Sequence, residues 1–112
     1  MQVRDANIVI ATSTTISSVF AVSPGDVIVG IQISDTFDGT AITLQNSIDG
    51  GATYETVKDI FSNTLSIAIT DDTGGYYAID PTLMYGMALV KFIAGTAQVA
   101  NETIKVATVK VG

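Results

Sequence analysis

Side chains branched at Cβ dominate this sequence, and they constrain its fold more than any other feature. Ile, Val and Thr account for 41 of the 112 residues, whereas Leu occurs only four times. Branching at Cβ restricts side-chain rotamers and crowds a helix, but it suits the pleated surface of a β-sheet. The composition therefore favours an all-β protein.

Apolar and polar residues alternate along several segments, which is typical of strands that bury one face. Clusters of Asp, Gly and Pro separate these segments, and such clusters form turns. No segment keeps the 3.6-residue apolar period of a helix. We predict strands near residues 7–12, 18–22, 27–34, 41–48, 53–58, 65–70, 76–79, 88–94 and 103–111.

Eight or nine short strands with this spacing predict an antiparallel β-sandwich of jelly-roll or Ig-like topology, with a barrel as the alternative. We expect one β-sandwich domain over residues 7–112. Residues 1–6 carry mixed charge and few apolar groups, so we expect a flexible N-terminal arm there. Asp80 and Pro81 suit the cap and the first position of a single helical turn.

The composition also excludes several classes of function. The chain has no Cys and no His, so it has no disulfide framework, no Cys/His zinc site, no Cys nucleophile and no His general base. Eleven acidic and five basic residues give a net charge of −6, and we expect no binding to nucleic acid or to an anionic membrane surface. The apolar stretches are too short for a signal peptide or a membrane helix, so we expect synthesis in the cytoplasm.

Residues 47–54 resemble the Asp-box turn S-x-D-x-G-x-T-W, with a tyrosine in place of the tryptophan. We assign a structural role in this turn to Ser47, Asp49, Gly50, Gly51, Thr53 and Tyr54. In such a turn the aspartate accepts hydrogen bonds from backbone amides, the glycines form the tight bend and the aromatic ring packs under the loop. In the sialidase-type propellers that carry the box, it recurs in every blade away from the catalytic site. A single copy therefore indicates a hairpin and not a glycosidase.

Acidic residues at bends are the candidates for a calcium site or for acid–base catalysis, and they are Asp35, Asp38, Asp71, Asp72 and Asp80. None of them has the spacing of a calcium-binding loop, and Asp is an ordinary turn residue. We therefore predict no metal site, no cofactor and no catalytic residue.

Aromatic side chains are the candidates for an interaction surface. Phe20 and Phe92 lie among apolar neighbours, and we expect both in the core. Phe37, Tyr76 and Tyr77 are assigned to a candidate interaction surface, for example one that stacks on sugars. Tyr76 and Tyr77 are adjacent, so on a strand they point to opposite faces and one of them is expected to be exposed.

Two longer segments, VIVGIQISDTFDGTAITLQNSIDGGATYETVKD and YYAIDPTLMYGMALVKFIAGTAQVANETIKV, resemble small structural proteins of tailed bacteriophages and prophages. The pattern of that family has a hairpin of the form F-x-G-T-x-[IL]-T-[FL]-Q-x-S-x-D-G-G-x-T-[YFW]. It continues with YYA-[IL]-D-P and a Lys-containing strand before [SA]-G-T-A. These elements correspond to Phe37 to Tyr54, Tyr76 to Pro81 and Val90 to Thr96, and the resemblance extends over residues 27–111.

Two departures from this family stand out: Leu44 replaces the aromatic residue that is expected at that position, and Asn101-Glu102-Thr103 stands where Asp-Arg-Thr is common. These departures leave the subfamily open. The resemblance implies a non-enzymatic virion protein, on the capsid exterior, that decorates or cements the head by binding the major capsid protein as a dimer or trimer. A tail or fibre component, or a glycan-binding module, is the alternative.

Overall fold

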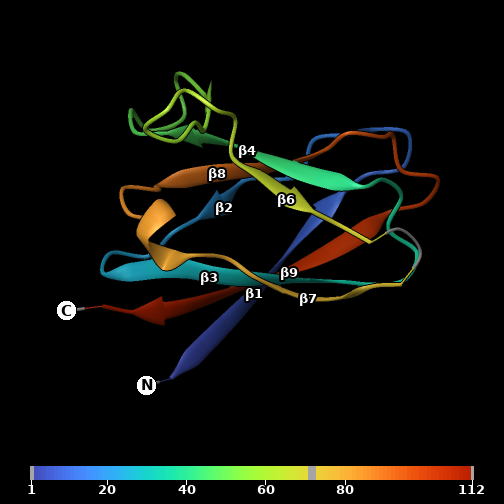
Figure 1. The fold of residues 1–112 in the computed structure, drawn as a ribbon, viewed down its shortest axis with the longest axis horizontal. Coiled ribbons are helices and arrows are strands. Elements are labelled where there is room, and N and C mark those ends of the chain that lie inside the picture. Colours follow the sequence, from blue (N-terminus) through green and yellow to red (C-terminus); the bar gives the residue numbers. More distant parts are fainter. Residues whose placement is uncertain (1, 71–72, 112) are drawn as a thin grey trace.

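Two antiparallel β-sheets are stacked face to face (Figure 1). The computed structural model describes residues 2–70 and 73–111. The first sheet contains, in spatial order, β1 (Val3–Ile10), β9 (Glu102–Lys110), β3 (Asp26–Ile33) and β7 (Gly75–Ala78). The second contains β2 (Phe20–Ala21), β8 (Leu89–Ala94), β4 (Ala41–Ser47) and β5 (Glu55–Thr56), with β6 (Ser66–Ala68) paired to β4. The predicted all-β antiparallel sandwich is confirmed.

The alternation seen in the sequence is the alternation between core and solvent. In β8, Val90, Phe92 and Ala94 are buried, and the residues between them are less so. The first sheet faces them with side chains such as Ile31 and Ile104, which are completely buried. Burial of branched side chains between the two inner faces is the main stabilising contribution in such a sandwich.

Strand β9 lies in the middle of the first sheet. It pairs at eight positions with β1 and at six with β3. The register with β3 shifts between Ile28 and Gly30, which is a β-bulge. The bulge explains why Ile28 and Ile31, although three residues apart, are both completely buried.

The segment that follows β1 joins the two sheets along one side. Ser17 pairs with Ile10 of the first sheet, and Ile16 pairs with Ile93 of the second. The Ser17 hydroxyl also accepts a hydrogen bond from the Phe92 amide at 2.9 Å. This side of the sandwich is therefore closed by the chain itself.

The N-terminal arm predicted over residues 1–6 is wrong for residues 3–6. These residues form the first half of β1 and pair with β9 from Val3↔Val109 to Ala6↔Val106. Their side chains are exposed, so the apolar alternation that reveals a strand is missing. Their backbone pairing, together with an ion pair between Arg4 and Asp26 at 3.3 Å, holds them against the sheet.

The predicted helical turn is present as the 3-10 helix η1 (Pro81–Leu83). The Asp80 carboxylate accepts a hydrogen bond from the Thr82 amide at 3.1 Å, and Pro81 occupies the start of the helix. This short helix leads from β7 in the first sheet to β8 in the second (Figure 1).

One aromatic side chain lies across a glycine on a neighbouring strand. Tyr76 of β7 is 55% exposed, and its ring covers Gly30 of β3 so closely that a methyl group on Gly30 would overlap it.

We therefore predict that Gly30→Ala lowers the free energy of unfolding by about 1 kcal/mol, because the ring must move away. Urea unfolding measures this loss.

The same substitution in a Tyr76→Ala background is the control. There the added methyl group meets no ring, so the loss caused by Gly30→Ala should disappear. An equal loss in both backgrounds would show that the cost lies in the strand backbone and not in the ring.

Candidate interaction site

Two tight turns project from the second sheet at one end of the sandwich (Figure 1, green and yellow-green). The first, residues 47–54, connects β4 to β5, and the second, residues 58–64, connects β5 to β6. Each turn is organised by one aspartate, and a pocket lies beside them.

The first turn is the Asp-box segment. The Ser47 hydroxyl donates to Asp49 Oδ1 at 2.7 Å and accepts from the Gly51 amide at 2.9 Å. The same Asp49 oxygen accepts from the Thr53 amide at 2.9 Å. Gly50 and Gly51 have φ values of 75° and 95°, which favour glycine strongly. The six residues assigned to the turn from the sequence therefore include the ones that make its hydrogen bonds and its bend.

Tyr54 completes this turn from below. Its hydroxyl lies beside Gly51, and the Lys91 ammonium group of β8 lies 4.0 Å from the centre of its ring. A cation at this distance over an aromatic face is attracted by the ring electrons. The contact attaches the turn to the neighbouring strand, and it could not be predicted from local patterns because β8 is distant along the chain.

Asp49 is the electrostatic centre of the turn. The hydrogen bond from the Ser47 hydroxyl, and then that from the Thr53 amide, lower the pKa of the Asp49 carboxyl group below its ordinary value. Both donors favour the charged carboxylate over the protonated form. The turn is therefore most stable when Asp49 is ionised.

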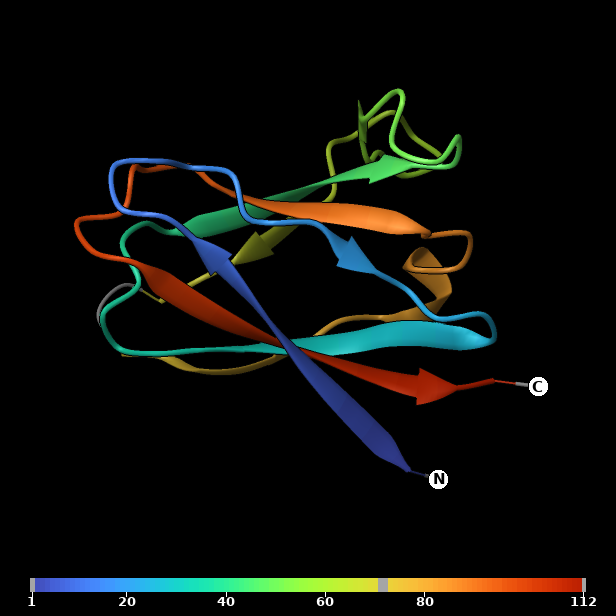
Figure 2. The ribbon, with the colours of Figure 1, turned by 180° about the vertical axis from the view of Figure 1, so that it is seen from behind.

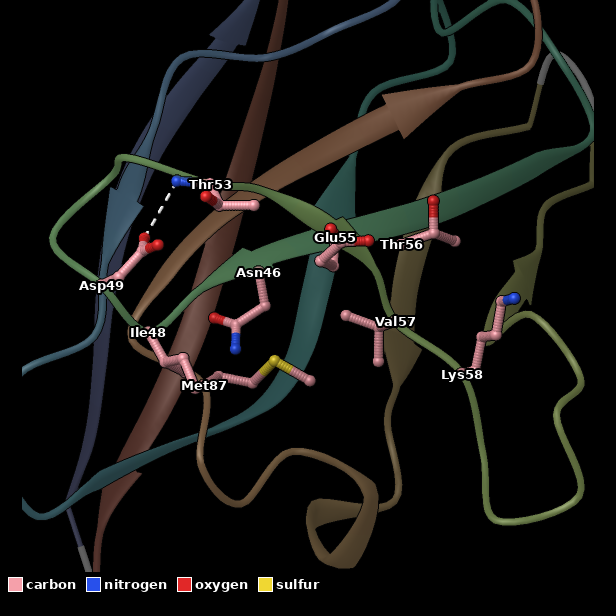
Figure 3. A pocket seen from close by; sticks show the side chains of 9 residues that line it. All are labelled: Asn46, Ile48, Asp49, Thr53, Glu55, Thr56, Val57, Lys58 and Met87. Carbon is pink, nitrogen blue, oxygen red and sulfur yellow. Dashed lines mark hydrogen bonds between the residues drawn. The ribbon is translucent and has the colours of Figure 1, made fainter.

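A pocket of about 440 Å³ lies beside this turn, at the end of the sandwich (Figure 3). We call it the end pocket, and it is lined by Asn46, Ile48, Asp49, Thr53, Glu55, Thr56, Val57, Lys58 and Met87. Figure 3 shows Ile48 and Met87 on one side, Val57 at the centre and Lys58 at the far side. The pocket thus combines an apolar floor with charged residues at its rim.

Hydrogen bonds of Asn46 hold the two walls of the end pocket together. Its side-chain oxygen accepts from the Ala88 amide at 2.9 Å, next to Met87. Val57 packs against the core, so the floor is continuous with the interior of the sandwich. Apolar surface surrounded by charged groups is the usual composition of a protein–protein contact.

The second turn presents two large apolar side chains to solvent. Ile60 is 91% exposed and Phe61 is 76% exposed, and we call this pair the apolar tip. Asp59 Oδ1 accepts from the amides of Phe61 and Asn63 at 2.8 and 3.0 Å, and Lys58 pairs with Thr64 at the base. The apolar tip is therefore held by a hydrogen-bonded turn.

The sequence reasoning missed the apolar tip. The available signal was Ile-Phe between Asp59 and Ser62-Asn63, since turns normally carry polar residues at such positions. Two adjacent large apolar residues inside turn chemistry do not follow the alternation of a strand, and their exposure is a marker of an interaction site.

The aromatic residues assigned from the sequence do not form one surface. Phe37 is buried in the core, so its assignment to an interaction surface is wrong. It lies in the connection that crosses from β3 in the first sheet to β4 in the second, where its ring fills the end of the core. Tyr77 is partly buried and its hydroxyl accepts from the Thr70 amide at 3.0 Å, whereas Tyr76 is exposed. Phe20 and Phe92 are in the core, as expected.

Two of the acidic residues at the bends accept hydrogen bonds from backbone amides. Asp38 accepts from the Val99 amide at 2.9 Å, and Asp80 caps η1. Asp71 and Asp72 lie outside the described residues. Among the residues that the structure describes, no group of three or more acidic side chains comes together as it would around a metal ion.

No family model, curated protein or solved structure matches this chain. In the part of the chain that the structure describes, no helix is both long and apolar enough to cross a membrane.

The lowered pKa of Asp49 leads to a test of the turn. A carboxyl group whose pKa is lower in the folded state stabilises that state above its unfolded pKa of about 4, and the contribution is lost as the pH falls through the folded value. We predict that the protein is more stable than its Asp49→Asn variant at pH 7, and that this difference shrinks below about pH 4. Urea unfolding of both proteins between pH 7 and pH 2 measures it. A difference that does not change with pH would contradict the role of the ionised carboxylate.

Proposed function

We propose that this chain is a non-enzymatic structural protein in the virion of a tailed bacteriophage, where it binds the outer surface of the head and stabilises the capsid lattice. The resemblance over residues 27–111 supports this assignment. Its segments are distant in sequence but adjacent in space, because β4 pairs with β8 from Ile42↔Ala94 to Ser47↔Leu89. Two of its three elements, Phe37 to Tyr54 and Val90 to Thr96, thus lie side by side in the second sheet, whereas Tyr76 to Pro81 begins on β7 of the first.

The open edge of β1 is the observation that carries the proposal. The amide and the carbonyl of Val9 both contact Ser18, at 3.2 and 2.9 Å, and so point away from β9. Backbone groups alternate in direction along an antiparallel edge strand. The amides and carbonyls of Val3, Asp5 and Asn7 therefore point outward as well, beyond the segment that Ser18 covers (Figure 2).

An open edge of this kind accepts a further strand. A segment of the major capsid protein that pairs with β1 would form main-chain hydrogen bonds, and these do not depend on particular side chains in either protein. Each such contact is weak, but a dimer or trimer that engages several capsid subunits binds by avidity and clamps the lattice. The net charge of −6 also suits a position outside the head, away from packaged DNA.

Proline substitution tests the open edge. Asp5→Pro removes an amide that points outward, and proline is tolerated on such an edge. We predict that this variant keeps its thermal stability but binds heads that lack the protein at least about tenfold more weakly than the natural chain does, because one pair of main-chain hydrogen bonds is blocked. Co-sedimentation of the purified proteins with such heads measures the affinity.

Ala6→Pro is the matched control, since the neighbouring amide points toward β9 and its loss should lower the stability of the fold itself. Equal binding of heads by Asp5→Pro and the natural chain would reject the open edge as the contact.

Electron cryomicroscopy of the virion tests the location, and density only at the tail or fibres would reject the decoration role. Heads without the protein should also lose heat resistance.

A tail or fibre component that binds glycans is the second candidate, and the exposed ring of Tyr76 favours it. An exposed tyrosine offers a flat face for stacking on a sugar ring. A glycan array would then show binding that is lost in Tyr76→Ala and retained in Val99→Ser, which removes an exposed side chain elsewhere.

A further inference from the structure

The apolar tip and the end pocket are neighbours on one face of the molecule. Lys58 lines the end pocket and also pairs with Thr64 at the base of the turn that carries the apolar tip. The apolar tip, which projects, and the end pocket, which has an apolar floor, therefore lie side by side, separated by Lys58. Such a face is complementary to itself, because a two-fold rotation places the projection of one copy opposite the hollow of the other.

We propose that two copies of this chain pair about a two-fold axis, with the apolar tip of each copy inserted into the end pocket of the other. The occupant of the pocket is then Phe61, accompanied by Ile60. A volume of about 440 Å³ is within the range that holds a ligand larger than one aromatic ring. The apolar floor formed by Val57 and Met87, with Ile48 at 83% exposure beside it, would cover the inserted ring.

Charges at the rim of the pocket match the base of the tip. Asp49, Glu55 and Lys58 all line the end pocket, and Lys58 also stands directly before the turn that carries the tip. When the tip enters the pocket of the second copy, Lys58 comes to the acidic rim of that copy. The two-fold axis repeats this contact, so each dimer contains two contacts between oppositely charged side chains.

The turn is prepared for insertion before the partner arrives. The two hydrogen bonds accepted by Asp59 fix the backbone of Phe61 and Asn63, so little conformational entropy remains to be lost when the tip is buried. A central aromatic side chain that fills a pocket is the typical hot spot of an interface. Asp59 is therefore a positioning residue of the dimer and Phe61 its anchor.

Analytical ultracentrifugation over a series of concentrations tests the pairing on the purified full chain, without virions. We expect a reversible dimer for the natural chain. Phe61→Ser and Ile60→Ser should weaken it at least about tenfold. Their melting temperatures should equal that of the natural chain at concentrations low enough for all three to be monomeric, because both side chains are exposed in the monomer. Val99→Ser, which removes a side chain that is 80% exposed at the opposite end, should dimerise as the natural chain does. A natural chain that stays monomeric, or that forms a trimer, would overturn the proposal, as would an undiminished dimer of Phe61→Ser.

A charge exchange tests the two-fold register independently of the tip. Lys58→Glu and Glu55→Lys should each weaken the dimer several-fold, since each brings like charges together. Mixing the two variants should restore association as a heterodimer, because both contacts then join opposite charges. Effects within one chain are not changed by mixing, so an absence of heterodimer would reject this register. If the dimer does not form, the prediction that β1 binds heads is not affected. The two proposals can therefore fail independently of each other.

Discussion

Pairing along β9 is the interaction on which the rest of the structure depends. This strand forms ladders with two partners that lie far from it in the sequence, β1 and β3, and its inward residues Ile104 and Val106 are completely buried. Its first residue, Glu102, is buried as well and accepts hydrogen bonds from the hydroxyls of Ser34 and Thr36 at 2.6 and 2.8 Å. Because β1 exists as a strand only against β9, the open edge proposed to bind the head is itself a product of this pairing.

The two ends of the sandwich are built differently. At the end that contains residues 95–101, the side chain of Gln98 is buried and links two connections: it donates to the carbonyls of Asp38 and Thr96 and accepts from the Asp38 amide, at 2.8 to 3.0 Å. A buried amide with these partners is costly to disturb, which makes that end a structural closure. The other end carries the end pocket, which is lined by Asn46, Met87 and residues of the Asp-box turn and β5. The contrast explains why the candidate interaction site lies on one end only.

Local patterns in the sequence predicted what depends on local physics. Apolar alternation predicted the strands, the Asp-box residues predicted a hairpin turn, and Asp80 with Pro81 predicted the short helix. Each of these elements is determined by a few adjacent residues. The strand over residues 3–6 was missed because it depends on the free edge of β9 and not on side chains of its own. Phe37 was misplaced because its burial depends on a crossing between the sheets. The end pocket depends on how β4, β5 and Met87 meet, and such distant contacts leave no periodicity in the sequence.

The two proposed contacts use different chemistry and lie on different sheets, and this separation has a consequence for binding. The edge of β1 belongs to the first sheet and offers backbone groups, whereas the apolar tip and the end pocket belong to connections of the second sheet and offer specific side chains. A dimer formed through the second sheet leaves both β1 edges free. Two weak edges carried by one dimer bind a repeating lattice far more tightly than either edge alone, because the second contact forms at a high effective concentration. Pairing of the chain with itself would then be the step that turns a marginal strand contact into stable decoration of the head.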